Sequence, residues 1–371
     1  MSISAIGIIF SNMHDEEMHE ITQCRTMGAL PFGGRYRLID FPLSSMHNSG
    51  ITSVGVIAKS NYQSLLEHLG SGKEWDLSRK RGGLFIFPPF SRLATGIYKN
   101  KIEALYGILT FLKKSTSNYV VLTDCDAICN INWQKPLDYH IKQKADITVL
   151  YYSVDPKNEI KNETVYQVSQ DGFVTDIRIN QNINEPSNIG TNMWITGRNF
   201  LISMLQEAFA HNLENIERDI FLKKLDQYKI AALKIENYIR KANSISDFFH
   251  ANMDTLNLSI REDLFFKNGP IHTKVYDTVP TKYGKDAKVQ NSLISGGCVI
   301  LGQVENSILF RGVKIGKGTK INNSIIMNNC SIGENVNLNH VLADKNVAFA
   351  NNRMLMGYDM RPIYLSKGSK V

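Results

Sequence analysis

The sequence predicts an α/β domain with a mostly parallel sheet, followed by a left-handed parallel β-helix of hexapeptide repeats. Two patterns indicate this fold class. Short apolar runs alternate with amphipathic helical stretches over the first 255 residues, and aliphatic residues then recur every five or six positions. With 43% hydrophobic and 21% charged residues among 371, the chain can bury a sizeable core. We therefore expect an α/β domain over residues 1–257, a linker over 258–287 and the β-helix over 288–371.

The α/β part is predicted from apolar runs that are short enough to be buried strands. These runs cover residues 5–10, 54–58, 119–122 and 147–152. Amphipathic helices are expected at 101–114, 200–209 and 216–225. A last helix opens at Ser244, with Asp247 three positions later in the manner of a capping box. Active sites in such sheets lie beyond the carboxyl ends of the strands, so chemistry is expected in the loops after Phe10 and Leu122.

The β-helix is predicted from a period that no α-helix can hold. Its aliphatic members are Val299, Val304, Leu309, Ile315, Ile321, Ile326, Ile332 and Leu338. Three short strands per coil of a triangular solenoid place each of these side chains on the one a coil below. Eight members in register indicate a coil over about residues 288–349. Glycine and proline at positions 269, 270, 280 and 284 mark a linker before it.

Composition and charge exclude several classes of protein. No run of about 18 apolar residues predicts a membrane span, and the first residues lack the features of a signal peptide. Five cysteines without metal-ligand spacing suit a reducing compartment, so we expect a cytoplasmic protein. The net charge of +7 resides after residue 255, with 15 basic and 8 acidic residues there. That segment is either a solvated basic surface or a site for anionic metabolites or an acidic partner; nucleic acid is not expected.

Three separated motifs carry a resemblance to a known family. They are LPFGGRYRLIDFPLS at 30–44, continuing to NSGI at 48–51, then ANMD at 251–254 and SGGC at 295–298. The chain resembles glucose-1-phosphate adenylyltransferases, also called ADP-glucose pyrophosphorylases, along its whole length. The resemblance implies a nucleotidyltransferase-like, Rossmann-like domain. Active members make ADP-glucose from ATP and glucose 1-phosphate with Mg²⁺.

The triphosphate-binding elements of that family are degraded here. Active members carry a turn of the form Gly-Gly-x-Gly-x-Arg after the first strand, whose backbone amides approach phosphate closely. This chain instead has Ser11, Asn12 and His14, followed by three carboxylates at positions 15–17. The family's phosphate-binding lysine aligns with Met27. The resemblance therefore predicts that ATP is not bound in a reactive position.

The metal and sugar elements are altered as well. One family magnesium ligand is replaced near Asp124 and Asp126, either of which could still substitute, and the second aligns with Lys241. A charged lysine only donates hydrogen bonds and cannot ligate Mg²⁺. The adenine segment is changed at 96–101, and the sugar-phosphate segment at 184–194 lacks its lysine. We expect no catalytic residue, metal or cofactor in this chain, with Mg²⁺ only in a catalytic partner.

Arg35 and Arg37, in the best-preserved segment, are candidates for binding a sugar-phosphate or phosphate effector, because guanidinium groups match phosphate oxygens bidentately. The alternative is a surface salt bridge. The leading hypothesis is a regulatory subunit with little or no activity alone, paired with a catalytic paralogue in a heterotetramer. An active adenylyltransferase with an unusual site and a homo-oligomeric sugar-phosphate-binding protein are the alternatives.

Overall fold

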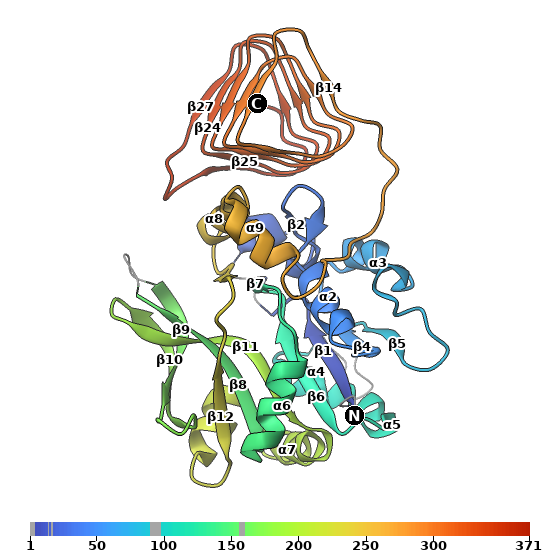
Figure 1. Ribbon diagram of the computed structural model, residues 1–371, viewed down its shortest axis with the longest axis vertical. Coiled ribbons are helices and arrows are strands. Elements are labelled where there is room, and N and C mark those ends of the chain that lie inside the picture. Colours follow the sequence, from blue (N-terminus) through green and yellow to red (C-terminus); the bar gives the residue numbers. More distant parts are fainter. Residues whose placement is uncertain (1–3, 14, 16–17, 90–97, 156–159) are drawn as a thin grey trace.

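The computed structural model describes residues 4–13, 15, 18–89, 98–155 and 160–371. An α/β domain is followed by a β-helix that lies across one of its ends, as Figure 1 shows. The predicted fold class is confirmed. Within the described residues, no helix is both long enough and apolar enough to cross a membrane.

One mixed sheet forms the centre of the α/β domain. Its strands are β1 (Ala5–Phe10), β4 (Ser53–Ile57), β5 (Gly83–Phe87), β6 (Tyr119–Asp124), β8 (Ile147–Val154), β9 (Ile160–Val168), β10 (Val174–Ile183), β11 (Ser187–Gly197) and β12 (Ile230–Lys234). The order β10-β9-β11-β6-β1-β4-β5 has β8 paired to β11 and β12 paired to β8. Strands β6, β1, β4 and β5 run parallel, whereas β11 is antiparallel to β6, β8 and β9. The antiparallel part was not predicted.

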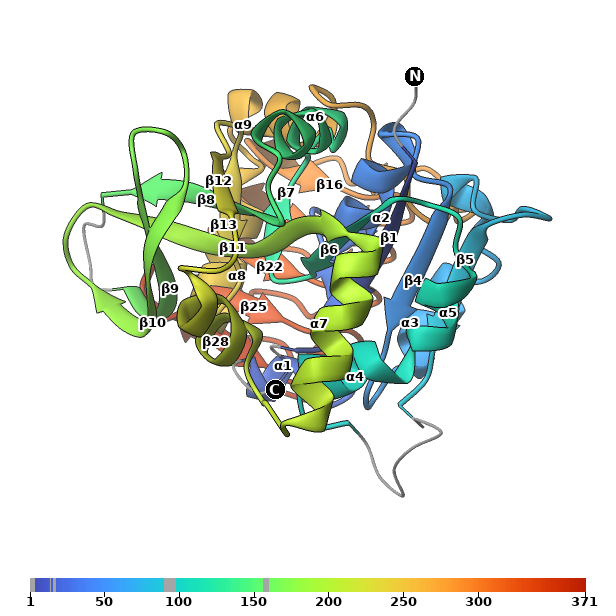
Figure 2. The same cartoon turned by 90° about the horizontal axis from the view of Figure 1, so that it is seen from below.

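Helices cover both faces of the sheet. They are α1 (His19–Thr22), α2 (Asp40–Asn48), α3 (Gln63–Leu69), α4 (Lys101–Gly107), α5 (Leu109–Lys114), α6 (Gln134–Gln143), α7 (Arg198–Ala210), α8 (Ile245–Asp254) and α9 (Leu258–Phe265). Residues of α4, α5 and α7 share one core with one face of β1, and residues of α2, α3, α6 and α8 share the other core. Figure 2 shows these layers from below. All six residues of β1 are buried for this reason, as expected for a strand covered on both faces.

Most expected elements of this domain are present, with two breaks. The helix expected at 101–114 is divided at Ile108 into α4 and α5, after Gly107. The stretch expected to be helical at 216–225 forms a π-helical turn, η3 (Ile216–Phe221), and a 3₁₀ turn, η4 (Leu222–Lys224). The capping prediction at α8 is confirmed, because the Asp247 N–H donates to the Ser244 hydroxyl at 3.0 Å.

The β-helix contains three five-stranded parallel sheets. Its strands are β14 (Lys282–Tyr283), β15 (Lys288–Gln290), β16 (Leu293–Ile294), β17 (Val299–Ile300), β18 (Gln303–Glu305), β19 (Ile308–Leu309), β20 (Lys314–Ile315), β21 (Lys320–Asn322), β22 (Ile325–Ile326), β23 (Ser331–Ile332), β24 (Asn337–Asn339), β25 (Val341–Ala343), β26 (Ala348–Phe349), β27 (Met354–Met356) and β28 (Ile363–Leu365). Asparagines turn the corners with positive φ, which asparagine tolerates better than most residues, for example Asn306 at 45° and Asn329 at 59°. Of the range 258–287 assigned to a linker, 258–265 form α9 and 282–283 form β14.

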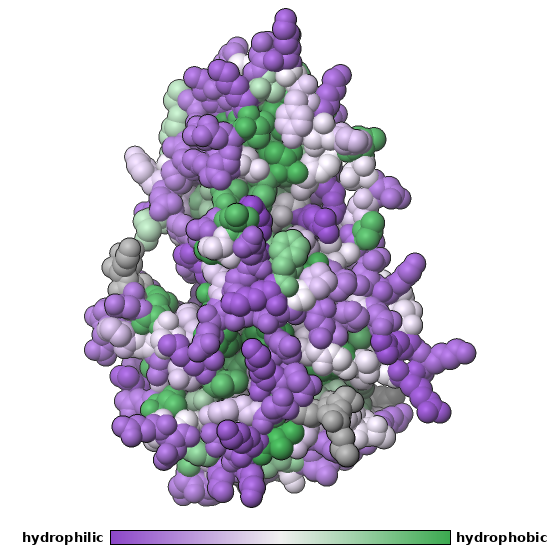
Figure 3. Space-filling model, viewed as in Figure 1, coloured by the Kyte–Doolittle hydropathy of each residue, from purple (hydrophilic) through white to green (hydrophobic). Residues whose placement is uncertain are grey.

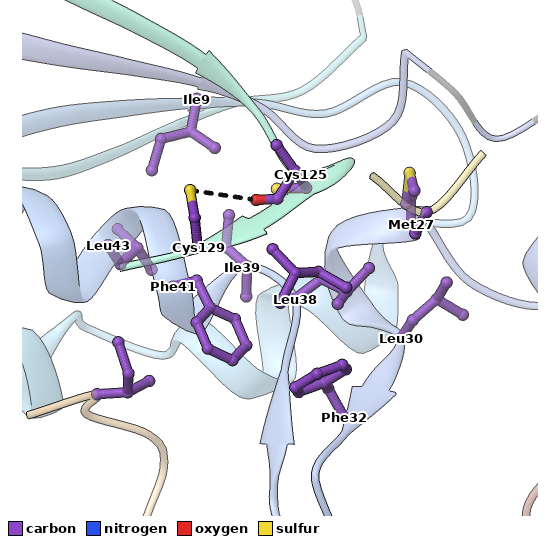
Figure 4. Packing of buried hydrophobic residues seen from close by; sticks show 14 of the residues in the cluster. Ile9, Met27, Leu30, Phe32, Leu38, Ile39, Phe41, Leu43, Cys125 and Cys129 are labelled. Carbon is purple, nitrogen blue, oxygen red and sulfur yellow. Dashed lines mark hydrogen bonds between the residues drawn. The ribbon is translucent and has the colours of Figure 1, made fainter. Parts of the chain in front are cut away.

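The two domains share one hydrophobic core. Figure 4 shows part of this cluster in the α/β domain, including Cys125 and Cys129. Side chains of the β-helix belong to the same cluster, among them Phe310, Met327 and Leu342. The β-helix is therefore held on the α/β domain by apolar packing as well as by the polar contacts described below.

Candidate functional site

The backbone of the loop after β1 is hydrogen-bonded to other segments of the α/β domain. The Ser11 N–H and hydroxyl both donate to the Ile57 carbonyl, at 3.1 and 2.8 Å. The Ser11 carbonyl accepts from the Gly28 N–H at 2.8 Å. Asn12 is also buried, and the Tyr98 hydroxyl donates to its Oδ1 at 3.3 Å. The Ser11 amide is therefore directed to the next strand and is not free for a phosphate.

A carboxylate of the protein occupies the N-terminus of the 3₁₀ helix η1 (Met27–Ala29). Oδ1 of Asp15 accepts a hydrogen bond from the Met27 N–H at 2.8 Å. The Met27 side chain is 1% exposed and belongs to the hydrophobic core, as Figure 4 shows. The position that aligns with a phosphate-binding lysine thus carries a core side chain. His14, Glu16 and Glu17, together with residues 96–97, lie outside the described residues.

The two aspartates at the end of β6 each face an ammonium group. Asp124, the last residue of β6, forms an ion pair with Lys101 at 2.8 Å and is 1% exposed. Asp126 is fully buried, and its Oδ2 lies 3.7 Å from Lys241 Nζ. The Asn192 amide donates to the same oxygen at 2.7 Å. Both candidate metal ligands therefore have a lysine as counter-charge.

Lys241 is the centre of a buried polar network. Its Nζ donates to Glu163 Oε2 at 2.7 Å, and Asn243 donates to Glu163 Oε1 at 2.6 Å. The Glu163 side chain is 1% exposed and that of Lys241 is 8% exposed. Burial alone would lower the pKa of Lys241, but the carboxylates of Asp126 and Glu163 outweigh burial and raise it. The ammonium group therefore stays charged.

This arrangement does not fit Mg²⁺. The ion takes oxygen ligands in near-octahedral geometry, and a neighbouring ammonium repels it. In the part of the chain that the structure describes, no three His, Cys, Asp or Glu side chains are grouped to hold a metal. Lys101 and Lys241 supply the positive charge that a metal would otherwise bring to Asp124 and Asp126.

Arg35 faces a cavity between the two domains. The side chain is exposed, and its guanidinium lies 5.0 Å from the ring centroid of Tyr36. The cavity has a volume of about 480 Å³, and Arg261, Lys274 and Arg311 also line it. No aspartate or glutamate is among its lining residues. The cavity is therefore strongly basic.

Arg37 is anchored by hydrogen bonds within the α/β domain. Its Nη1 donates to the Ser64 carbonyl at 2.6 Å and to the Ser64 hydroxyl at 2.9 Å. Its N–H donates to Asp40, whose other oxygen lies 2.5 Å from His68 Nε2. Asp40 is therefore a structural hydrogen-bonding residue. The Arg37 side chain also interacts with Tyr276, which lines the cavity that Arg35 faces, so the two arginines share a neighbour.

Arg37 also belongs to a basic cluster with Arg25 and Lys345, which we call the Arg25 cluster. Burial, together with the charges of Arg37 and Arg25, lowers the pKa of Lys345 to about 7. Arg25 is 3% exposed, and its Nη2 forms an ion pair with Asp344 at 2.5 Å. Its buried Nη1 has no hydrogen-bond partner among the described residues. A buried guanidinium nitrogen without an acceptor is an expected feature of an anion site.

Three long-range connections in this region were not predicted from the sequence. Strand β13 (Ile239–Lys241) pairs with β7 (Ala127–Cys129), and this places Lys241 beside Asp126. Glu163 comes from β9, 78 positions earlier in the chain than Lys241. Asp344 and Lys345 come from the β-helix. No local pattern signals any of these contacts, because each depends on long-range pairing.

Comparisons with known proteins agree with this architecture. A family model described as nucleotidyl transferase matches residues 14–166, and one described as GlmU-like, C-terminal hexapeptide matches 277–362. The glycogen biosynthesis protein GlgD of Bacillus subtilis (strain 168) is 34% identical over 363 residues, which cover 98% of this chain and 96% of the relative. GlgD of Geobacillus stearothermophilus is 34% identical, covering 86% of this chain and 84% of the relative. A glucose-1-phosphate adenylyltransferase of that species is 31% identical, with the same two coverages.

Proposed function

The chain belongs to the glucose-1-phosphate adenylyltransferase family, and we propose that it is a regulatory, catalytically impaired subunit of that enzyme. It pairs with a catalytic paralogue and modulates the synthesis of ADP-glucose from ATP and glucose 1-phosphate in glycogen biosynthesis. The observation that carries this proposal is the buried contact of Lys241 with Asp126 and Glu163. In support of the proposal, a relative named GlgD and a relative named glucose-1-phosphate adenylyltransferase both come from Geobacillus stearothermophilus.

The physical reason for impaired catalysis is the sign of the charges. Phosphoryl chemistry needs cations and amide donors around the triphosphate. The η1 amide that could serve is bound by Asp15. One carboxylate about 4 Å from a phosphate oxygen costs about 4 kcal/mol at an effective dielectric near 20. Bringing Mg²⁺, which carries two positive charges, to the same distance from the Lys241 ammonium costs about 8 kcal/mol at that dielectric.

We assign effector binding to the Arg25 cluster. An anion there would accept from Arg25 Nη1 and lie near Arg37 and Lys345. Its negative charge would also offset the burial and the repulsion by Arg37 and Arg25 that together lower the pKa of Lys345. Because Arg25 pairs with Asp344 of the β-helix, bound phosphate would act on the contact between the two domains. The ligand class is a phosphate or sugar phosphate.

The partner in this proposal is the catalytic paralogue, in a heterotetramer. The shared fold favours such pairing, because similar chains can form related interfaces. Edges of the α/β domain and faces of the β-helix are the surfaces available for it. This chain would have no resident cofactor, and Mg²⁺ would act in the paralogue.

The test of the proposal is kinetic. The purified chain with ATP, glucose 1-phosphate and Mg²⁺ is expected to show no turnover above background. Co-expressed with the paralogue, it is expected to co-purify and to change the paralogue's response to phosphate effectors. Turnover by the isolated chain at the rate of an active relative would overturn the proposal. So would the absence of any complex with the paralogue.

A restoration experiment sharpens this test. Glycine replaces Ser11, Asn12 and His14, lysine replaces Met27, and aspartate replaces Lys241. We expect these five changes to leave the chain far below full activity, because the adenine and sugar segments also differ. The matched control makes the five opposite substitutions in the paralogue, which should abolish the paralogue's activity. Full activity from the five changes alone would show that the remaining site is intact.

A further inference from the structure

The basic cavity beside Arg35 continues into a second one, which Leu258 and Phe266 line together with charged residues. The two have volumes of about 480 and 670 Å³, and Arg261 and Phe266 line both. We call this continuous concave surface the linker groove, since α9 and the chain that follows it form its walls. Figure 3 draws the face on which Figure 1 shows α9, and there green hydrophobic residues lie among purple hydrophilic ones where the β-helix meets the α/β domain.

Exposed apolar side chains line the groove. Phe266 is 67% exposed, Val275 71% and Leu258 59%. Val279, near the same wall, is 71% exposed. Single exposed aliphatic residues are ordinary, but several large ones around one concavity are typical of a binding surface. The groove is therefore suited to a ligand with apolar groups.

The charges of the groove are mainly positive. Arg35, Arg261, Lys274 and Arg311 line the first cavity, without any carboxylate. In the second, Glu262 and Asp263 occur with Lys267, and Lys267 pairs with Asp263 at 2.7 Å. The excess of positive charge requires a negatively charged occupant.

The cations are held in place before any ligand arrives. The Arg311 guanidinium lies 4.3 Å from the ring centroid of Tyr276, and Lys274 Nζ lies 5.6 Å from the same centroid. The Arg311 Nη2 also donates to the Arg35 carbonyl at 3.3 Å. Cation–π contacts of this kind fix the side chains and lower the ordering cost of binding.

We infer that the linker groove binds an acidic segment of another polypeptide that also carries apolar side chains. A small anion would use the four cations but would leave Phe266, Val275 and Leu258 in water. An uncharged apolar segment would cover those side chains and desolvate the cations without compensation, which is unfavourable. Only a segment with both carboxylates and apolar groups satisfies the whole groove.

The test uses the isolated full-length chain and three short fluorescent peptides. One alternates glutamate with leucine and phenylalanine, one alternates glutamate with serine, and one alternates lysine with leucine and phenylalanine. We expect saturable binding of the first peptide alone, weakened by added salt because the cations contribute. Phe266→Ser and Lys274→Glu should each weaken that binding about tenfold. Because no catalysis is measured, the result is independent of the regulatory function proposed above.

Two matched variants serve as controls. Met354→Ser removes an apolar side chain that is 69% exposed on β27, and Lys320→Glu reverses an exposed charge on β21. Both should leave peptide binding unchanged. Equal binding of the glutamate–serine peptide would reduce the groove to a simple anion site and overturn the inference. Absence of saturable binding, or equal effects of the control and groove variants, would overturn it as well.

Discussion

Replacing Lys241 with methionine tests the central ion pair directly. The change removes the ammonium group from between Asp126 and Glu163, whose side chains are at most 1% exposed. Removing one partner of a buried ion pair leaves an uncompensated buried charge and typically costs about 3–5 kcal/mol. We therefore expect the free energy of unfolding of Lys241→Met to fall by about that amount, measured from urea titrations followed by fluorescence.

The pH dependence of this loss has a definite sign. Burial raises the pKa of Glu163, and Lys241 opposes that rise in the native protein. Without Lys241, the folded-state pKa of Glu163 lies further above its unfolded value of about 4. A group with a raised folded pKa favours the native state below the unfolded pKa, and that contribution is lost as the pH rises through the folded pKa. The loss should therefore be small near pH 4 and complete at pH 7.

Two further variants separate charge from packing. Lys241→Met combined with Glu163→Gln removes one carboxylate, keeps an acceptor for Asn243, and should recover much of the lost stability. Lys320→Met, on the exposed surface of β21, should change stability by less than about 0.5 kcal/mol. The reasoning is refuted if Lys241→Met costs less than about 1 kcal/mol at pH 7, or if the loss does not shrink in acid.

Three other outcomes are expected. Asp344→Ala leaves Arg25 buried without its partner, so a loss of about 3–5 kcal/mol is expected in urea unfolding, and a loss below about 1 kcal/mol would contradict the pairing. Sulfate does not titrate between pH 6 and 8, and calorimetry should show that it binds about tenfold more weakly at pH 8 than at pH 6, because Lys345, with its pKa near 7, loses its charge. Lys345→Gln should flatten this dependence of sulfate affinity on pH. An unchanged pH dependence in that variant would exclude Lys345 from the site. Ser244→Ala removes the α8 cap and should cost about 1 kcal/mol, whereas Ser366→Ala, at an exposed position of the β-helix domain, should cost less.

Local patterns predicted those elements whose determinants lie close together in the chain. Strand β1 is a continuous apolar run because both of its faces are covered, and the Ser244 cap needs only a residue three positions away. The coils of the β-helix were predicted because aliphatic residues recur every five or six positions. The antiparallel strands β9, β10 and β11 were missed, since their alternation is interrupted by register shifts at Arg178 and Gln181.

The site was predictable in residue identity but not in contacts. Alignment to the family motifs placed Met27 and Lys241 at altered positions. It could not show that Glu163 would meet Lys241, or that Arg37 would lie near Arg25 and Lys345. Those outcomes depend on how β9, β13 and the β-helix pack against the sheet, which is set by long-range pairing and not by local spacing.

The altered positions now stabilise the fold, and this constrains how the site can be changed. Met27 belongs to the core, Lys241 neutralises buried carboxylates, and Arg25 joins the β-helix to the α/β domain. Returning Met27 to lysine would place an ammonium in an apolar cluster, where burial of an unpaired charge is strongly unfavourable. Returning Lys241 to aspartate would put a third carboxylate beside Asp126 and Glu163. Each reversion therefore carries a stability cost of its own, and recovery of catalysis requires repacking around the site as well as restored ligands.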